Sequence, residues 1–157
     1  TDYIHEAKAI LKSNKIDLGS SFDLEISHHY GLNKFRQYGC FLFNCINRKY
    51  AKKIVLLFAN QKHPLHKHKL KEETFQILSG ILKSTLNGKE RLSYPGDTIL
   101  VSPGIWHKFS ALKEPCIFEE VSTTSYSNDS FYNDESINKK SREERKTRLN
   151  NFNTSEL

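Results

Sequence analysis

The sequence predicts an all-β protein, and two observations lead to this prediction. Between about residues 20 and 124, Gly, Pro and Asn recur so often that only strand-length segments lie between them. Those segments either alternate apolar with polar residues or are continuously apolar, as strands do. Short strands separated by regular turn signals are typical of a β-sandwich or a closed barrel. A chain of 157 residues is the size of one domain, so we expect residues 1–157 to form a single unit.

The N-terminal segment is the exception to the strand pattern. Ile4, Ala7, Ile10 and Leu11 follow one another at helical spacing. We therefore expect one amphipathic helix over residues 3–13, ahead of a barrel that runs from about 20 to 124.

The barrel region contains the predicted strands. Phe22, Leu24 and Ile26 alternate with polar residues and predict the first strand, over 22–27. The remaining predicted strands span 39–47, 52–59, 73–79, 81–86, 90–94, 98–102 and 115–124. Turns are predicted at the Asn87–Gly88 pair and at the Pro-Gly pairs of 95–96 and 103–104. The apolar residues expected in the core of these strands are Phe41, Phe43, Val55, Leu57, Leu100 and Phe118.

The C-terminal extension, residues 125–157, is rich in polar and charged residues. This composition predicts a mostly irregular segment that wraps around the barrel, with a short helix near 141–148 and a frayed end.

Composition limits the partners and the location. The net charge is +6, but the excess lies around the histidines and in the tail and forms no aromatic-interleaved stripe, so we expect no nucleic acid partner. An anionic sugar or sugar phosphate suits such a basic rim at least as well. The longest apolar run, residues 54–59, is too short to span a membrane. Three cysteines without C-x-x-C spacing and an N-terminus without a signal pattern predict reduced thiols in a cytoplasmic protein.

The stretch HPLHKHKLKEETFQILSG, residues 63–80, contains the residue types of a metal site. In a strand, His66 and His68 would point to the same side, and Glu73 opens the next predicted strand. His107 follows the second Pro-Gly turn. Three imidazoles and one carboxylate suit a divalent metal with positions left open for water or substrate. The alternative is a set of solvated histidines in a lysine-rich loop.

This spacing resembles the two motifs of the cupin superfamily. The first motif is matched by His66, His68, Glu73 and Gly80, although Asn60 replaces its opening glycine. The second is matched from Gly96 through Pro103-Gly104 to His107, with the proline and glycine adjacent rather than one residue apart. The resemblance implies a double-stranded β-helix, a jelly-roll barrel, that binds one divalent metal through His66, His68, Glu73 and His107. That ligand set suits Zn, Mn, Fe, Ni or Co.

From about residue 26 to 132 the sequence also resembles the cupin domains associated with sialic acid (nonulosonate) synthases and, more distantly, the D-lyxose isomerases. The isomerase pattern H-x-H-x2-K-x-E adds Lys71, the strand pattern E-V-S matches Glu120 to Ser122, and Lys53 stands where such isomerases have a lysine. The resemblance implies a sugar or sugar acid as ligand and a synthase as a partner, attached or separate.

For aldose–ketose isomerisation a base must move a proton between adjacent carbons. Glu120 shares a strand face with Phe118 and Cys116, so an apolar barrel could raise its pKa towards the working pH. Lys53 or Lys71 could supply a proton or stabilise an oxyanion. The alternative is that Glu120 is an edge-strand charge and that both lysines are solvated. Trp106 is either core filler or a platform on which a sugar stacks.

Two function classes follow. The first is a metal-dependent carbohydrate isomerase or epimerase, linked to the biosynthesis of sialic acid-like sugars. The second is a non-catalytic module that binds a sugar and regulates or tethers a sialic acid synthase. In either case, exposed sheet edges and the N-terminal helix predict a homodimer.

Overall fold

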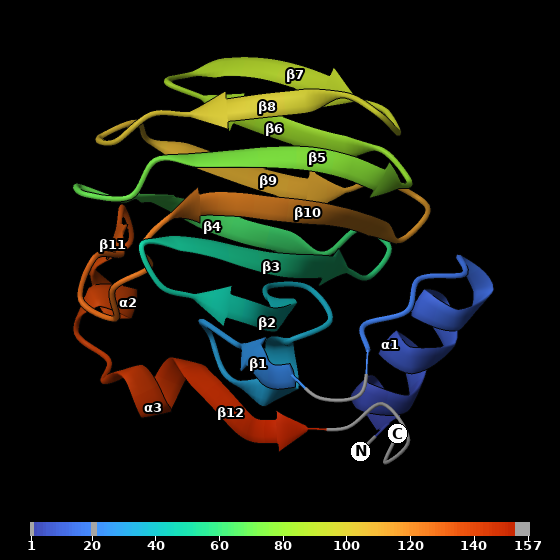
Figure 1. Ribbon diagram of the computed structural model, residues 1–157. Coiled ribbons are helices and arrows are strands. Elements are labelled where there is room, and N and C mark those ends of the chain that lie inside the picture. Colours follow the sequence, from blue (N-terminus) through green and yellow to red (C-terminus); the bar gives the residue numbers. More distant parts are fainter. Residues whose placement is uncertain (1, 20–21, 153–157) are drawn as a thin grey trace.

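Two antiparallel sheets face each other and form the body of the protein (Figure 1). The computed structural model describes residues 2–19 and 22–152; the expected start of the barrel at about residue 20 and the expected frayed end lie outside this part of the chain. The larger sheet has the strand order β12-β1-β2-β3-β10-β5-β8, and the smaller has the order β11-β4-β9-β6-β7. This arrangement is a jelly-roll barrel, which confirms the predicted fold class.

The helices are short apart from the first. They are α1 (Asp2–Ser13), the 3-10 helix η1 (Leu32–Lys34), α2 (Glu135–Asn138) and α3 (Arg142–Arg145). The strands are β1 (Phe22–Ser27), β2 (Cys40–Asn47), β3 (Tyr50–Leu57), β4 (Lys62–Lys67), β5 (Glu73–Ser79), β6 (Leu82–Leu86), β7 (Lys89–Ser93), β8 (Thr98–Val101), β9 (His107–Ala111), β10 (Cys116–Thr123), β11 (Phe131–Tyr132) and β12 (Lys146–Phe152). None of the helices in the described part of the chain is both long and apolar enough to cross a membrane.

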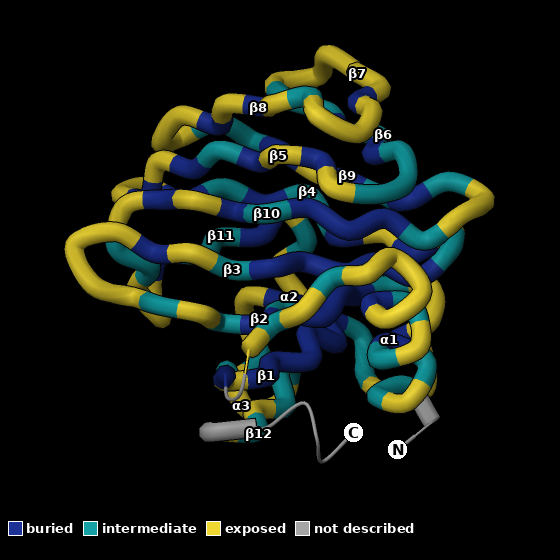
Figure 2. Tube along the Cα trace, turned by 45° about the vertical axis from the view of Figure 1, so that its right-hand side comes forward, coloured by how far each residue is buried: buried dark blue, intermediate teal, exposed yellow. Residues whose placement is uncertain are grey.

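Strand alternation gives the large sheet two different faces. Phe22, Leu24 and Ile26 of β1 point to the face that α1 covers with Ala7 and Leu11. The opposite face of the same sheet looks into the barrel, where a second apolar cluster includes Val55, Phe75, Ile77, Phe109 and Phe118. Figure 2 shows the strands of the middle of the sheet as mostly buried, whereas β7 and the loops at the ends are exposed.

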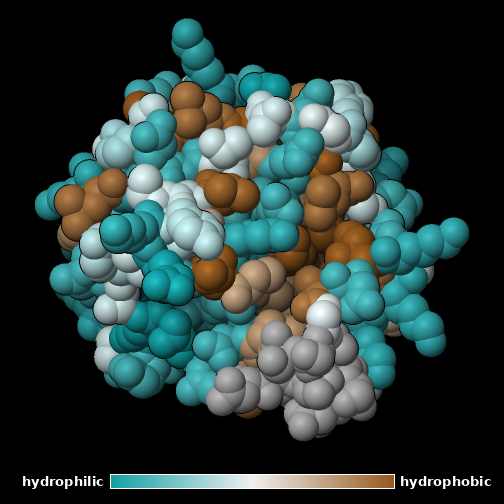
Figure 3. Space-filling view, viewed as in Figure 1, coloured by the Kyte–Doolittle hydropathy of each residue, from teal (hydrophilic) through white to brown (hydrophobic). Residues whose placement is uncertain are grey.

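The core prediction is wrong at one position. Leu100 is 58% exposed, because its neighbours Ile99 and Val101 take the inward positions of the edge strand β8. The outer face of the large sheet also exposes Leu78 of β5 and Val121 of β10. The space-filling view shows apolar side chains scattered among polar ones on the face turned to the viewer (Figure 3).

The tail is more regular than its composition indicates. The expected helix near 141–148 ends at Arg145, and Lys146–Phe152 forms the edge strand β12, which pairs antiparallel with β1. Ser141 begins α3 with a capping box, in which its side chain and that of Glu144 satisfy each other's backbone N–H groups. The extension therefore completes the large sheet and supplies one wall of the cavity described below.

Candidate metal centre

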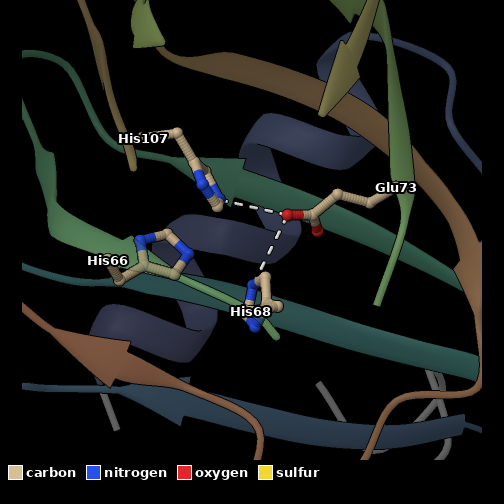
Figure 4. Close-up of side chains that lie close together, drawn as sticks. All are labelled: His66, His68, Glu73 and His107. Carbon is tan, nitrogen blue, oxygen red and sulfur yellow. Dashed lines mark ion pairs between the residues drawn. The ribbon is translucent and has the colours of Figure 1, made fainter. Parts of the chain in front are cut away.

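Four buried side chains converge inside the barrel: His66, His68, Glu73 and His107 (Figure 4). One possible ligand atom from each lies within 4.8 Å of the others. His66 belongs to β4 and pairs directly with His107 at the start of β9, so the ladder between two strands brings these two imidazoles together. Glu73 begins β5 in the opposite sheet. The barrel thus assembles the set from both of its sheets.

Backbone carbonyls orient the three imidazoles. The Nδ1 atoms of His66, His68 and His107 lie 2.8–2.9 Å from the carbonyl oxygens of Pro64, Asp129 and Ile105, in that order. A carbonyl oxygen only accepts hydrogen bonds, so each Nδ1 carries the proton and each Nε2 keeps a free lone pair. This fixed tautomer is the one that metal-binding histidines use.

The carboxylate of Glu73 faces these lone pairs. Its Oε2 atom lies 3.0 Å from Nε2 of His107 and 3.4 Å from Nε2 of His68. Oε2 of Glu73 and Nε2 of His107 are buried without a hydrogen-bond partner among the described residues. With the His107 proton on Nδ1, both atoms are acceptors, so their close approach is not a hydrogen bond. Buried acceptor atoms that face one another without a donor need a cation. The four residues therefore fit a divalent metal.

The electrostatics of the site favour the ligand forms of these groups. Burial, together with the neighbouring histidines, holds the pKa of His66 well below 6.5. Burial and Lys71 lower the pKa of His68 to about 4, although Glu73 opposes them. Burial alone would raise the pKa of Glu73, but Lys71 and the surrounding imidazoles outweigh it and lower that pKa well below 4.5. At neutral pH His66 and His68 are therefore neutral imidazoles and Glu73 is an ionised carboxylate, the forms that metal binding requires.

The three residues expected to take part in catalysis line the same cavity as His66, His68 and Glu73, a space of about 410 Å³. The ammonium group of Lys71 lies 3.1 Å from Oε1 of Glu73 and 3.1 Å from Oε2 of Glu120. Glu120 is 7% exposed and stands directly opposite Lys53 in the ladder between β10 and β3. Lys53 donates to the hydroxyl of Ser125 at 3.1 Å. Burial and Lys71 lower the pKa of Lys53.

Glu119, the neighbour of Glu120, points the other way. It lies on the outer face of the sheet and pairs with Lys52 at 3.3 Å. Trp106 is half-buried on the outside of the small sheet, where the ammonium group of Lys67 lies 4.7 Å from its ring centroid. It does not line the barrel cavity, so it offers no platform to a ligand at the metal centre.

One residue that supports the site, Asp129, escaped sequence reasoning. The carboxylate of Asp129 accepts hydrogen bonds from the backbone N–H groups of Lys69, Leu70 and Lys71, and so fixes the loop between His68 and Glu73. His63 packs against the His66 ring, with centroids 4.3 Å apart. Asp129 lies in a polar loop without any strand signal, so only its long-range contacts reveal it.

Comparison with known proteins supports the fold. The model of the cupin domain matches residues 54–122, a range that contains all four converging residues and Glu120. None of the curated proteins matches the chain. Among solved structures, the L-ribose isomerase of Geodermatophilus obscurus superposes with a TM-score of 0.72 at 13% identity, over 87% of this chain and 92% of that one. The L-ribose isomerase of Cellulomonas parahominis with L-ribose gives 0.70 at 12% identity, over 88% and 92%.

A more distant structural neighbour covers less of the chain. KdgF from Halomonas sp. superposes with a TM-score of 0.53 at 14% identity, over 57% of this chain and 82% of that one. At these identities the likeness is one of fold. The two L-ribose isomerases match beyond the barrel strands, since they cover nearly nine-tenths of this chain.

Proposed function

We propose that this protein is a metal-dependent carbohydrate isomerase or epimerase, with a sugar or sugar acid as its substrate. One observation in particular supports this function. Glu120, a buried carboxylate that is not one of the four converging residues, lies in the same cavity and is joined to Glu73 through Lys71. A base beside a metal centre, in a largely enclosed cavity, is what proton transfer between adjacent sugar carbons needs. The L-ribose isomerases with the same fold are consistent with this proposal.

The roles of the residues follow from their positions. His66, His68, Glu73 and His107 would hold a divalent metal, which when bound polarises the sugar oxygens and stabilises an enediolate. Glu120 would take the proton from carbon and return it to the neighbouring carbon. Lys71 would hold Glu120 in place through its 3.1 Å contact, and Lys53 would donate to the sugar oxygen that gains negative charge.

The test is exchange of carbon-bound hydrogen of a sugar in deuterated water. Glu120→Gln keeps the shape of the side chain but removes the base, so we expect exchange to fall by about 10²-fold or more, the usual effect of one general base. Glu119→Gln is the matched control, because Glu119 belongs to the same strand and points outwards to Lys52. Exchange that persists in Glu120→Gln would exclude Glu120 as the base.

The second candidate is a non-catalytic sugar-binding module that acts with a sialic acid synthase. The basic cavity wall described below favours an anionic ligand and is compatible with a sugar acid. This candidate predicts no exchange on any pentose, hexose or N-acetylated amino sugar, and a change only in ligand affinity for Glu120→Gln. A pull-down with a sialic acid synthase would test the partner.

We also propose a homodimer and a cytoplasmic location. In the structure α1 packs on its own sheet, so the helix need not be exchanged between copies. Light scattering at micromolar concentration should give twice the mass of one chain; a single-chain mass would exclude the dimer.

A further inference from the structure

The wall of the cavity formed by the tail differs chemically from the metal end. It is lined by four cationic side chains, Arg142, Arg145, Lys146 and Arg148, and Lys53 of β3 adds a fifth cation to the cavity. The acidic side chains on this wall are the buried Glu25 and the exposed Asp23 of β1. Figure 1 shows α3 and β12 along β1, at the opposite edge of the large sheet from β8. One end of the cavity thus presents imidazoles and carboxylates, and the other presents mainly positive charge.

Glu25 neutralises only part of this charge. It pairs with Arg142, Lys146 and Arg148 at 3.2–3.4 Å. In the described part of the chain, no carboxylate oxygen lies within 4.0 Å of the Lys53 ammonium or the Arg145 guanidinium. The Nε atoms of Arg142 and Arg145 are buried without a hydrogen-bond partner among the described residues. Buried cationic donors that lack acceptors require an anion or incur a desolvation cost.

The simpler explanation is that these cations serve only to attach the tail to β1. Glu25 accounts for that role, because its three partners come from α3 and β12. It does not account for Lys53, which belongs to β3 and faces the interior of the barrel. Nor does it account for Arg145, whose guanidinium lies over the Tyr132 ring, 5.2 Å from its centroid, on the cavity wall.

The order of strands gives the length that a ligand needs to reach both ends of the cavity. In the large sheet β10 lies between β5 and β3, so Glu73 and Lys53 are two strand spacings apart. At about 4.8 Å per spacing, that separation is roughly 10 Å. The distance from Glu73 to β1, four spacings away, is about twice as long. A cavity of about 410 Å³ holds a small ligand of that length rather than a polymer.

We propose that the substrate is an anionic sugar, a monosaccharide with a phosphate or carboxylate group that Arg145 and Arg148 bind at the end of the cavity remote from the metal centre. Arginine suits this role because its planar guanidinium binds phosphate and carboxylate through two parallel hydrogen bonds. This inference rests on the proposed sugar ligand and names its class. It does not require turnover.

Calorimetric titration of the metal-loaded protein tests the proposal through binding alone. The probes are matched pairs: D-ribose with D-ribose 5-phosphate, D-mannose with D-mannose 6-phosphate, and D-galactose with D-galacturonate. We expect the charged member of at least one pair to bind about tenfold more tightly or better, and the advantage to shrink as salt is added. The first two pairs report on phosphate and the third on carboxylate. Equal affinities within all three pairs would overturn the proposal.

Variants locate the anion site. Arg145→Gln and Arg148→Gln should each remove most of the preference for the charged sugar and leave the affinity for the neutral partner and the metal content unchanged. Arg91→Gln is the control, because this exposed arginine of β7 loses the same charge far from the cavity. If both variants keep the full preference, the anion binds at the metal and the proposal is wrong. Arg148 is about half exposed, so its variant should fold even if the Arg145 variant does not.

The outcome separates this inference from the proposed function. A preference for the charged sugar that Arg148→Gln removes, without hydrogen exchange on any sugar, would support the anion site and leave the binding module as the function. Exchange on neutral sugars at the same kcat/KM as on their charged partners would support the isomerase and overturn the anion site.

Discussion

The imidazole of His68 donates from Nδ1 to the backbone carbonyl oxygen of Asp129, 2.8 Å away, although 61 positions separate the two residues in sequence. The side chain of Asp129 accepts from three successive backbone N–H groups just after His68. One residue of the tail therefore fixes both a candidate ligand and the loop that positions Lys71. Its role is to position these groups, because neither the cavity nor the candidate metal centre includes its side chain.

Asp129→Asn should weaken metal binding and destabilise the protein. The amide has one acceptor oxygen instead of two, and its NH₂ group would face backbone N–H groups, so we expect a loss of about 2–3 kcal/mol in the free energy of unfolding. Metal affinity should fall by tenfold or more, as for other partners that orient metal ligands (10–100-fold). Urea denaturation and metal titration measure the two effects. Asp97→Asn is the control, since Asp97 caps an exposed turn through Tyr94 N; equal losses of metal affinity in both variants would contradict the role of Asp129.

Metal content is the direct test of the four-residue centre. Protein prepared without chelator should contain about one divalent ion per chain, since a set of three imidazoles and one carboxylate holds a single ion. The double change His66→Ala and His107→Ala removes two of the converging Nε2 atoms and should abolish this metal. Elemental analysis measures the result. His5→Ala, which alters an exposed histidine of α1, should keep the metal. A double variant that retains the ion would place the metal site elsewhere.

Glu25 should make stability depend on pH in the acid range. Burial would raise its pKa, but Lys146, Lys53 and Arg148 outweigh burial and lower that pKa from 4.5 to about 2. Because the folded state binds the proton less tightly than the unfolded chain, the stabilisation is complete above about pH 4.5 and is lost as the pH falls towards 2. Glu25→Gln should therefore destabilise the protein by about 2–3 kcal/mol at neutral pH, since it removes the buried counter-charge of Arg142, Lys146 and Arg148.

Urea denaturation of both proteins at several pH values tests the direction of this pH dependence. The difference in urea midpoint between wild type and Glu25→Gln should be greatest at pH 5–7 and should shrink between pH 4 and 3. Glu90→Gln, which breaks the exposed pair with Lys83, should change stability by less than about 1 kcal/mol at any of these pH values. A Glu25 difference that stays constant from pH 7 to 3 would contradict the linkage.

The sequence predicts the barrel well because its strands follow local rules. Alternation over 22–27 gives β1 without any shift in its bounds, and the glycines and prolines mark the turns. The spacing of His66, His68, Glu73 and His107 likewise predicts the candidate centre. The spacing predicts that His66 and His68 share one strand, but β4 ends at Lys67 and His68 lies just beyond it. The backbone carbonyl of Asp129, rather than the strand, orients the His68 imidazole.

The tail could not be predicted in the same way. Along β12, the charged residues Lys146 and Arg148 alternate with Thr147 and Leu149. The face turned to the cavity therefore carries charged residues rather than apolar ones. Such a strand forms because β1 offers it a backbone ladder and because Glu25 pairs with Lys146 and Arg148. Both causes lie more than a hundred residues away, so local periodicity does not contain them.

The last prediction concerns the contact between Lys71 and Glu120, and it separates structural from catalytic roles. Burial would lower the pKa of Lys71, but Glu120 and Glu73 outweigh burial and raise it, so the lysine is charged between two carboxylates. Lys71→Met would leave Glu73 and Glu120 buried near each other without a counter-ion. We expect it to cost about 3–5 kcal/mol of folding free energy, the usual effect of removing one partner of a buried pair. Adding Glu120→Gln to Lys71→Met removes one of the two stranded charges and should restore part of this stability.

The two single variants and the double variant form a thermodynamic cycle that urea denaturation can complete. The coupling between the two positions should be at least about 1 kcal/mol, because the residues are in direct contact. Hydrogen exchange on a sugar substrate should behave differently. It should stay low in the double variant even where stability returns, because the general base is still missing. A double variant that regains both stability and exchange would show that Glu120 has only a structural role beside the metal centre.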